Sequence, residues 1–266
     1  MGFVIYQVDA FTDTPFTGNP AAVCLLEDDR SDAWMQALGA EMNVSETAIV
    51  ERREENNAFN LRWFTPVMEV DLCGHATLAA AHVLWEGGVA SADQAIVFHT
   101  RSGILTATRQ HGLIELDFPP DPVSEIPSPP GMEAALGLSA VYVGKGRDDY
   151  LVVVDSAQQV RHLSPDFRRL ANIPGRGFIV TASGDGEFDF VSRFFAPRAG
   201  IEEDPVTGSA HCTLAGYWQE RLGKPVFTAR QLSKRGGTLR VVVAGERIML
   251  GGQAVTVLQG NLYDGL

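Results

Sequence analysis

The chain has few of the residues that mark several common protein classes. Only three of its 266 residues are cysteines, Cys24, Cys73 and Cys212, and they form no CxxC pair and lie near no cluster of histidines. An odd number of widely spaced cysteines is typical of free thiols in a reducing compartment. The pattern therefore predicts neither a disulfide framework nor a metal site.

Basic residues and long apolar runs are also scarce. Lysine and arginine number 21 against 33 acidic residues, which gives a formal net charge of −12 and opposes binding to nucleic acid phosphates. No segment has the length of a membrane span, and the first residues lack the basic and apolar regions of a secretory signal. We therefore expect a cytoplasmic protein with no nucleic acid or membrane partner.

What the chain does contain is the composition of a globular protein. Apolar residues make up 45% of the sequence and charged residues 20%, while glycine and proline are dispersed. A chain of this length forms either two domains or one large domain.

An internal repeat favours two domains. "LRWFTPVMEVDLCGHATLAAAHVLWE" from Leu61 resembles "SRFFAPRAGIEEDPVTGSAHCTLAGYWQE" from Ser192, with an Arg, an aromatic residue and a Pro followed by an acidic stretch, a Gly and an apolar segment. The offset between matching residues grows from 131 to 134, so the second copy carries a three-residue insertion between its Pro and its Gly. A period near half the chain indicates a duplicated domain, and the Pro-rich segment 118–131 predicts domains at 1–119 and 120–266.

The pattern within each half predicts an α+β fold. Short alternating segments with Gly turns, such as 95–118 and 247–262, are typical of antiparallel strands. Helices are expected near 31–42, 75–86, 165–171 and 209–222. Because 75–86 is apolar nearly all round, it must be enclosed, and a curved, mostly antiparallel sheet wrapped around a central helix would enclose one such helix in each half.

An enclosed helix can still present its N-terminus to a cleft. Free backbone N–H groups and the positive end of the helix dipole attract a carboxylate or a developing oxyanion there. Gly74-His75 and Gly208-Ser209 stand at these positions, and glycine allows a ligand to approach the backbone closely. Two such ends facing one cleft between the domains would bind a small anionic metabolite.

Glu46 and His75 are the first candidate catalytic residues. Glu46 in "NVSETAIV" is either an ordinary solvated carboxylate or a general acid or base in an apolar cleft. His75 is either a polar surface residue or a side chain that the helix dipole keeps neutral, able to donate or accept one hydrogen bond. The other histidines, among them His82 and His211, are interpreted as structural.

Four further residues are candidates for the site, and three of them have two interpretations each. Asp204 either complements the helix dipole or holds a histidine, or a substrate amine or hydroxyl, and Ser209 either caps the helix or contacts the substrate. Asn19 in "FTGNPAAV" is a turn residue or offers its amide to a ligand carboxylate. Cys73 lies where a helix N-terminus can lower a thiol pKa, but its counterpart Thr207 supplies no second thiolate.

Four strings together resemble the phenazine-biosynthesis PhzF-like family of isomerases, whose fold is similar to that of diaminopimelate epimerase. They are "VDAFTDTPFTGNPAAV", "NVSETAIV", "RWFTPVMEVDLCGHATLAA" and "RFFAPRAGIEEDPVTGSAH", in the expected order over nearly the whole chain. The resemblance implies two topologically alike halves with the active site in the interdomain cleft, no metal or organic cofactor, and a homodimer.

The resemblance also implies roles for individual residues. Glu46 would shuttle a proton with the help of His75 and Asp204, while Gly74, Gly208 and Ser209 would hold the carboxylate or enol of the substrate. In the characterised branch the substrate is a dihydro-hydroxyanthranilate, isomerised by moving a proton and shifting double bonds. This chain has "RQLSKRGGTLRV" where a Gly-Arg-Pro-Ser-like string is expected, so the sequence does not specify the phenazine substrate.

Three functions follow as hypotheses. The first is cofactor-independent isomerisation of a small carboxylic acid by general acid/base catalysis. The second is a one-base epimerase or a dehydratase of an amino or hydroxy acid that uses Cys73. The third is a non-catalytic metabolite-binding protein, which has no need of the set Glu46, His75 and Asp204.

Overall fold

The computed structural model describes residues 3–263 and divides into two compact units. The first unit comprises the residues up to Asp117 and those from Gly251 onward, and the second comprises Phe118–Leu250. The predicted division at 119/120 agrees with the first boundary but assigns the residues from Gly251 onward to the wrong domain. Strand β18 (Ala254–Asn261) belongs to the first unit because it pairs antiparallel with the whole of β1 (Val4–Ala10). Such pairing between the two ends of a chain leaves no local signal in the sequence.

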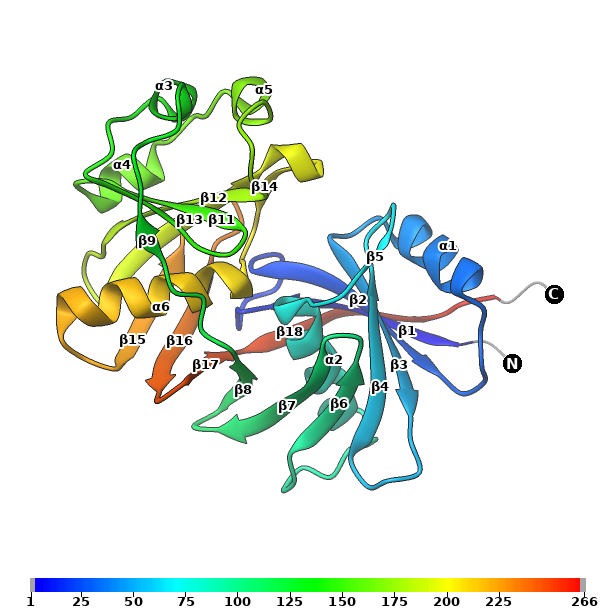
Figure 1. Cartoon of the computed structure of the whole chain (residues 1–266). Helices are drawn as coiled ribbons and strands as arrows, with labels where there is room; N and C mark the ends of the chain where they lie inside the picture. Colours follow the sequence, from blue (N-terminus) through cyan, green and yellow to red (C-terminus); the bar gives the residue numbers. More distant parts are fainter. Residues whose placement is uncertain (1–2, 264–266) are drawn as a thin grey trace. The chain divides into compact units, whose positions relative to one another are not determined.

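The first unit is a mostly antiparallel sheet with two helices (Figure 1). Its remaining elements are β2 (Asn19–Leu26), α1 (Asp32–Met42), β3 (Glu46–Arg52), β4 (Ala58–Phe64), β5 (Glu69–Val70), α2 (Gly74–Glu86), β6 (Ile96–Thr100), β7 (Gly103–Gln110) and β8 (Leu113–Phe118). Two pairs are parallel, β2 with β3 and β4 with β6, and each is joined by a crossover that contains a helix, α1 or α2.

The second unit repeats this order of pairing. It contains β9 (Ser124–Glu125), α3 (Met132–Leu136), β10 (Tyr142–Lys145), β11 (Asp149–Val153), α4 (Ala157–Arg161), α5 (Phe167–Leu170), β12 (Gly177–Ser183), β13 (Phe190–Ala196), η1 (Pro197–Ala199), β14 (Ile201–Asp204), α6 (Gly208–Leu222), β15 (Val226–Gln231), β16 (Gly237–Ala244) and β17 (Arg247–Gly252). Strands β11 and β12 pair in parallel across α4 and α5, and β13 and β15 pair in parallel across α6. The matching topology confirms the predicted repeat of fold.

The repeated sequence motif holds equivalent strands together in both units. Arg62 on β4 donates from Nε and Nη2 to the two carboxylate oxygens of Glu69 on β5, at 2.8 and 2.7 Å. Arg193 on β13 binds Glu203 on β14 in the same two-pronged way, at 2.6 and 3.0 Å. The turn η1 lies between Pro197 and Glu203, where the second copy has three extra residues. The repeated Arg and Glu are therefore structural residues.

Helices α2 and α6 occupy equivalent places in the two units. Most residues of α2 are buried, and it contacts β1, β2, β3 and β18. Helix α6 contacts β11 and β16 and is buried along most of its length. Both helices therefore confirm the prediction of an apolar helix enclosed by a sheet, and each begins at the glycine identified in the sequence, Gly74 or Gly208.

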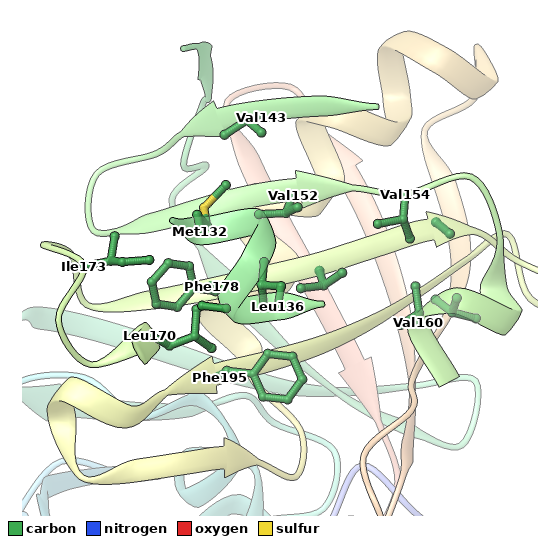
Figure 2. Packing of buried hydrophobic residues seen from close by; sticks show 14 of the residues in the cluster. Met132, Leu136, Val143, Val152, Val154, Val160, Leu170, Ile173, Phe178 and Phe195 are labelled. Atoms are coloured by element: carbon green, nitrogen blue, oxygen red, sulfur yellow. The ribbon is translucent and has the colours of Figure 1, made fainter. Parts of the chain in front are cut away.

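A second helical layer covers another face of each sheet. In the first unit Met35 and Leu38 of α1 pack with residues of the strands such as Ile49 and Phe64. In the second unit α3, α4 and α5 cover the strands, and Figure 2 shows Leu136, Val160 and Leu170 among the residues of this cluster. The sequence predicted the helices near 31–42 and 165–171 but not α3 or α4, which are only five residues long and have too few turns for an apolar period.

Among the described residues, no helix combines the length and the apolar character that a membrane crossing requires.

A pair of helical glycines gives a test of this packing. A Cβ on Gly39 of α1 would lie 2.9 Å from Cβ of Phe64, whereas nothing lies within 4 Å of a Cβ on Gly216 of α6. We expect Gly39→Ala to lower the free energy of unfolding by about 1–3 kcal/mol, because α1 must move away from β4. Gly216→Ala, at an exposed helix position, should raise it by about 1 kcal/mol. Urea unfolding of both variants checks this, and equal effects of the two changes would contradict the close contact.

Candidate active site

Asn19, Glu46 and His75 meet at one end of the first unit. Asn19 begins β2 and Glu46 begins β3, and these two strands run in parallel with Ala21 opposite Glu46. His75 is the second residue of α2. Nδ2 of Asn19 lies 3.2 Å from Nδ1 of His75, and Nε2 of His75 lies 3.2 Å from Oε2 of Glu46. The structure thus brings together Glu46 and His75, to which the resemblance gave a shared role, and places Asn19 beside them.

The contacts of the Asn19 amide determine which nitrogen of the His75 imidazole carries the proton. Oδ1 of Asn19 accepts a hydrogen bond from the Ser45 hydroxyl at 3.3 Å, which leaves its Nδ2 to donate to Nδ1 of His75. Burial lowers the pKa of His75 to about 3, so the ring is neutral at pH 7. A neutral ring that accepts at Nδ1 carries its proton on Nε2, which faces Glu46.

The Nε2 atom of His75 is close to Glu46 without a well-aligned hydrogen bond. The atom is buried and has no hydrogen-bond partner of acceptable geometry among the described residues, although the Glu46 carboxylate is within 3.2 Å. The side chains of His75 and Glu46 are 6% and 14% exposed. An unsatisfied buried donor costs free energy, so this N–H is prepared to bind an oxygen that is introduced by a ligand.

Cys73 lies beside the other nitrogen of the imidazole. Its Sγ is 3.5 Å from Nδ1 of His75, and the residue is 7% exposed. Cys73 is also the N-cap of α2, yet its side chain accepts no hydrogen bond from the helix. The thiol is therefore part of the same cluster as the carboxylate and the imidazole.

The loop before Asn19 has an unusual backbone. Phe11 and Phe16 have φ values of 62° and 70°, a conformation that side chains of this size rarely adopt. The backbone N–H of Phe16 donates to Asp9 at 2.7 Å, and a Cβ on Gly18 would lie 2.3 Å from the carbonyl oxygen of Ala10. The loop is thus tightly closed immediately before the residue that contacts His75, and strain of this kind concentrates at functional sites.

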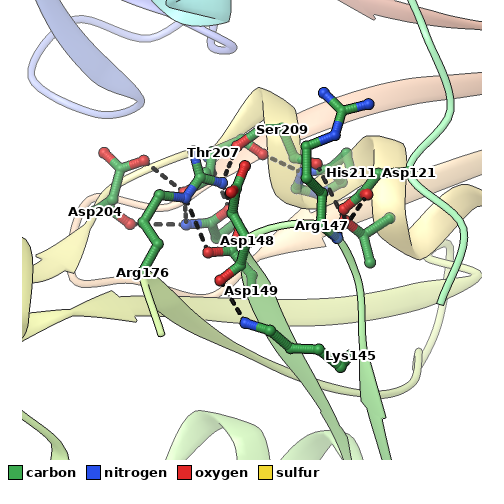
Figure 3. Close-up of polar contacts among 12 residues, drawn as sticks. Asp121, Lys145, Arg147, Asp148, Asp149, Arg176, Asp204, Thr207, Ser209 and His211 are labelled. Carbon is green, nitrogen blue, oxygen red and sulfur yellow. Dashed lines mark hydrogen bonds and ion pairs between the residues drawn. The ribbon is translucent and has the colours of Figure 1, made fainter. Parts of the chain in front are cut away.

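A second polar cluster surrounds the N-terminus of α6 in the second unit (Figure 3). Thr207 is the N-cap of α6, and its hydroxyl donates to Oδ2 of Asp204 at 2.5 Å rather than capping the helix. Gln231 accepts from the Thr207 N–H at 2.9 Å and donates to the Asp204 carbonyl at 2.7 Å. Asp204 is thereby held next to the beginning of the helix, as the sequence analysis expected of a residue four positions before Gly208.

Ser209 does not cap the helix, so the first of its two predicted roles is wrong. It is the second residue of α6, because the helix begins one residue earlier than expected, and its Oγ accepts from Nη2 of Arg176 at 3.1 Å. Gly208 is buried and Ser209 is half-buried. Neither α2 nor α6 has a side-chain cap, so their first N–H groups are left for other acceptors.

Sequence reasoning missed the ion pair that supports Ser209. Arg176 precedes β12, and its guanidinium binds both carboxylate oxygens of Asp149, with Nε 2.9 Å from Oδ1. Asp149 is 1% exposed, although a charged residue is almost never fully buried without a partner. The only signal in the sequence was an Asp at the beginning of an apolar strand. Gln231 was missed as well, although it lies in the string "RQLSKRGG" that departs from the phenazine branch.

His211 is a second buried neutral histidine. Burial lowers its pKa to about 4, against a smaller opposing effect of the bond between Nδ1 and the Thr207 carbonyl at 2.8 Å. Its Nε2 has no hydrogen-bond partner within the described residues. The matching residue of the first unit, Thr77, makes the same bond to the carbonyl of Cys73 at 2.6 Å. His211 therefore takes the place of a threonine that fastens the first turn of the helix.

The two buried histidines make stability depend on pH. Their pKa values in the folded state lie below the ordinary histidine value of 6.5, so acid protonates them preferentially in the unfolded chain. This stability is present above pH 6.5 and is lost as the pH falls towards the folded-state values. Between pH 7 and pH 5 we expect a loss of about 2 kcal/mol for each histidine, measured by urea unfolding.

Replacing one histidine tests the origin of this loss. His211→Thr, which copies Thr77, should reduce the acid dependence by about half, whereas Gly216→Ala on the exposed face of the same helix should leave it unchanged. An acid dependence that is the same in His211→Thr and in the wild type would contradict the assignment.

The pair Arg176–Asp149 gives a second test. Arg176→Gln removes the counter-charge of a buried carboxylate, so the free energy of unfolding should fall by about 2 kcal/mol; the side chain of Arg176 is 44% exposed and solvent reduces the effect. Adding Asp149→Asn to this variant should restore most of the loss. Thermal unfolding of these variants checks this, and Arg161→Gln, which breaks a surface pair with Asp185, should have little effect in the same experiment.

Comparison with known proteins agrees with this site. The family model for phenazine biosynthesis-like proteins matches residues 8–260. A protein of Halalkalibacterium halodurans named an uncharacterized isomerase is 53% identical over 260 residues, which cover 97% of each chain. The human phenazine biosynthesis-like domain-containing protein is 37% identical over 98% of this chain and 99% of its own.

Solved structures show the same relationship. A phenazine biosynthesis protein of the PhzF family from Enterococcus faecalis matches 99% of this chain and 100% of its own, with a TM-score of 0.94 and 43% identity. A probable proline racemase from Agrobacterium radiobacter K84 shares the fold alone, with a TM-score of 0.64 and 12% identity. With its fold, its repeated helix N-termini and its family match taken together, the chain belongs to the PhzF family, in which several curated relatives are named isomerases.

Proposed function

We propose that this protein is a cofactor-independent isomerase that moves a proton on a small carboxylic acid by general acid/base catalysis. The observation that carries the proposal is the pair Glu46–His75. A largely buried carboxylate lies 3.2 Å from an imidazole nitrogen that bears a proton and makes no well-aligned hydrogen bond. Such a pair can remove a proton and stabilise the oxygen that gains charge.

In the proposed reaction Glu46 takes a proton from a carbon next to a conjugated or carboxyl group. Nε2–H of His75 then donates to the oxygen that becomes negative, and the uncapped N–H groups of Gly74 and His75 add the positive end of the α2 dipole. Glu46 finally returns the proton to another carbon of the same conjugated system. Because the imidazole is neutral, it donates a hydrogen bond without giving Glu46 a permanent cationic partner.

The residues of the second unit are proposed to bind and to assist. Gly208 and Ser209 begin an uncapped helix, so their N–H groups suit a carboxylate or an enol oxygen of the substrate. Asp204 is proposed to hold a hydroxyl or amine of the substrate and to assist proton transfer, since Thr207 and Gln231 fix its position. Asn19 is proposed to act through His75, whose tautomer it determines.

One observation favours a second candidate, a one-base epimerase or a dehydratase. Sγ of Cys73 is 3.5 Å from Nδ1 of His75, so an imidazole could accept the thiol proton. A two-base mechanism with paired thiolates does not fit the chain, because the counterpart of Cys73 is Thr207 and its hydroxyl is bound to Asp204. The two candidates differ in the atom that carries the proton, Oε of Glu46 or Sγ of Cys73.

Proton exchange in deuterated buffer separates the candidates. The wild type and the variants Glu46→Gln and Cys73→Ser are incubated with a panel of small dienyl, hydroxy and amino carboxylates, and deuterium uptake is followed by mass spectrometry. We expect uptake that falls by at least about 100-fold in Glu46→Gln and persists in Cys73→Ser. Glu51→Gln, at the far end of the same strand, is the matched control and should behave like the wild type.

Other outcomes point elsewhere. Uptake lost in Cys73→Ser and retained in Glu46→Gln would replace the isomerase by the thiol-based epimerase or dehydratase. Ligand binding in calorimetry with no uptake by any protein, and equal affinity for the wild type and Glu46→Gln, would favour a non-catalytic metabolite-binding protein.

A further inference from the structure

We propose that Glu46, Cys73 and His75 also form a binding site for one zinc ion. Each residue offers one ligand atom, and the three atoms lie within 4.8 Å of one another. The carboxylate oxygen of Glu46 lies 3.2 Å from Nε2 of His75, whereas Sγ of Cys73 lies 3.5 Å from the other ring nitrogen, Nδ1. The residues come from the beginning of β3 and from the N-terminus of α2, so rigid elements hold them.

The kind of donor atom selects the metal. One thiolate, one imidazole and one carboxylate are the ligand types that zinc takes in proteins, whereas Mg²⁺ and Ca²⁺ take oxygen ligands. Three protein ligands leave the fourth tetrahedral position for water, as in open zinc sites. A thiolate and a carboxylate together neutralise the charge of the ion, so little charge has to be buried without a partner.

The imidazole has a nitrogen ready for the ion. Nε2 of His75 is buried, faces Glu46 and makes no hydrogen bond of acceptable geometry among the described residues. When zinc replaces its proton, Nδ1 must carry a proton instead and needs an acceptor. A rotation of the Asn19 amide by 180° supplies this acceptor, and the Ser45 hydroxyl can then accept from the amide instead of donating to it. Asn19 and Ser45 can thus hydrogen-bond to His75 in both tautomers, with the proton on Nε2 or on Nδ1.

The positions need only a small adjustment. Ligand atoms around tetrahedral zinc are about 3.3–3.7 Å apart, given bonds of about 2.0–2.3 Å. The separation of 3.2 Å between Glu46 and Nε2 is already close to this, so the main change is a rotation of the Cys73 side chain towards Nε2. The α2 dipole opposes a cation but favours the thiolate of Cys73, which accompanies the ion.

Binding changes the protons of the site in a defined way. The Cys73 thiol releases one proton to the buffer as sulfur binds the metal, while the His75 proton moves from Nε2 to Nδ1 through solvent. No electron is transferred. The ion would also occupy the Glu46 carboxylate, so zinc should inhibit proton transfer; this consequence rests on the proposed function, whereas the binding itself does not.

Cobalt and zinc titrations of the whole chain test the site. Co²⁺ is the spectroscopic probe, because coordination by a thiolate gives a charge-transfer absorption band, and Zn²⁺ should displace it at one ion per chain. We expect affinity for Zn²⁺, measured against a competing chelator, to fall at least about 10-fold in each of Cys73→Ser, Glu46→Gln and His75→Asn. The cobalt band should be absent in Cys73→Ser, and calorimetry in buffers of different ionisation enthalpy should show about one proton released.

Cys212→Ser is the matched control. Burial raises the pKa of Cys212 to about 12, and this thiol lies next to His211 on α6 outside the proposed site, so its loss should leave the band and the affinity unchanged. A far-UV circular dichroism spectrum shows which variants are folded, and if His75→Asn is not, Glu46→Gln and Cys73→Ser carry the test. Absence of a stoichiometric site, or a cobalt band retained in Cys73→Ser, overturns the proposal.

The exchange assay keeps the two proposals separate. Stoichiometric Zn²⁺ should abolish deuterium uptake by the wild type and not by Cys73→Ser. A thiolate band with no deuterium uptake under any condition would sustain the metal site and count against the isomerase. Uptake that is insensitive to Zn²⁺, with no band, would sustain the isomerase and reject the metal site.

Discussion

The structure depends on the burial of two apolar helices whose first turns have no side-chain caps. A helix that is apolar nearly all round cannot face water, so in each unit a sheet of this size and curvature is needed to enclose it. Enclosure fixes the position and direction of the helix. It therefore also fixes where the N–H groups of the first turn lie. Because the side chains of Cys73 and Thr207 do not cap these helices, each unit holds a fixed set of N–H donors that no side-chain cap occupies.

The repeat shows which residues serve the frame and which serve the chemistry. Arg62 with Glu69 and Arg193 with Glu203 make the same paired hydrogen bonds, and Thr77 and His211 fasten the first helical turn through equivalent carbonyls, those of Cys73 and Thr207. At the helix N-termini the side chains next to the shared glycine differ, with Cys73 and His75 in one copy and Thr207 and Ser209 in the other. A duplicated domain can specialise when both copies keep the same fold and differ in the side chains at the helix N-terminus.

The sequence alone identified the helices that carry the site because their apolar pattern is long and their glycines stand at the ends. Through the resemblance it also gave Glu46 and His75 a shared role, and the structure shows how these two residues meet Asn19. It could not show that β18 returns to β1, nor that Asp149 is buried against Arg176, because both depend on pairing between distant residues. Gln231 was missed for a different reason. An amide has no characteristic pattern, and only its three hydrogen bonds reveal what it does.

The state of His75 connects the fold with the proposed chemistry. An imidazolium 3.2 Å from Glu46 would form an ion pair with it, and the carboxylate would then be a poorer proton acceptor. Burial prevents this by keeping the ring neutral, and Asn19 directs the single ring proton to the side of Glu46. Burial and Asn19 also prepare the ring for a metal ion. When the Asn19 amide rotates and the ring proton moves to Nδ1, the lone pair of Nε2 becomes available. An arrangement that suits proton transfer by a carboxylate therefore also suits a zinc ion, and Cys73 supplies the third ligand to zinc without being needed for the transfer.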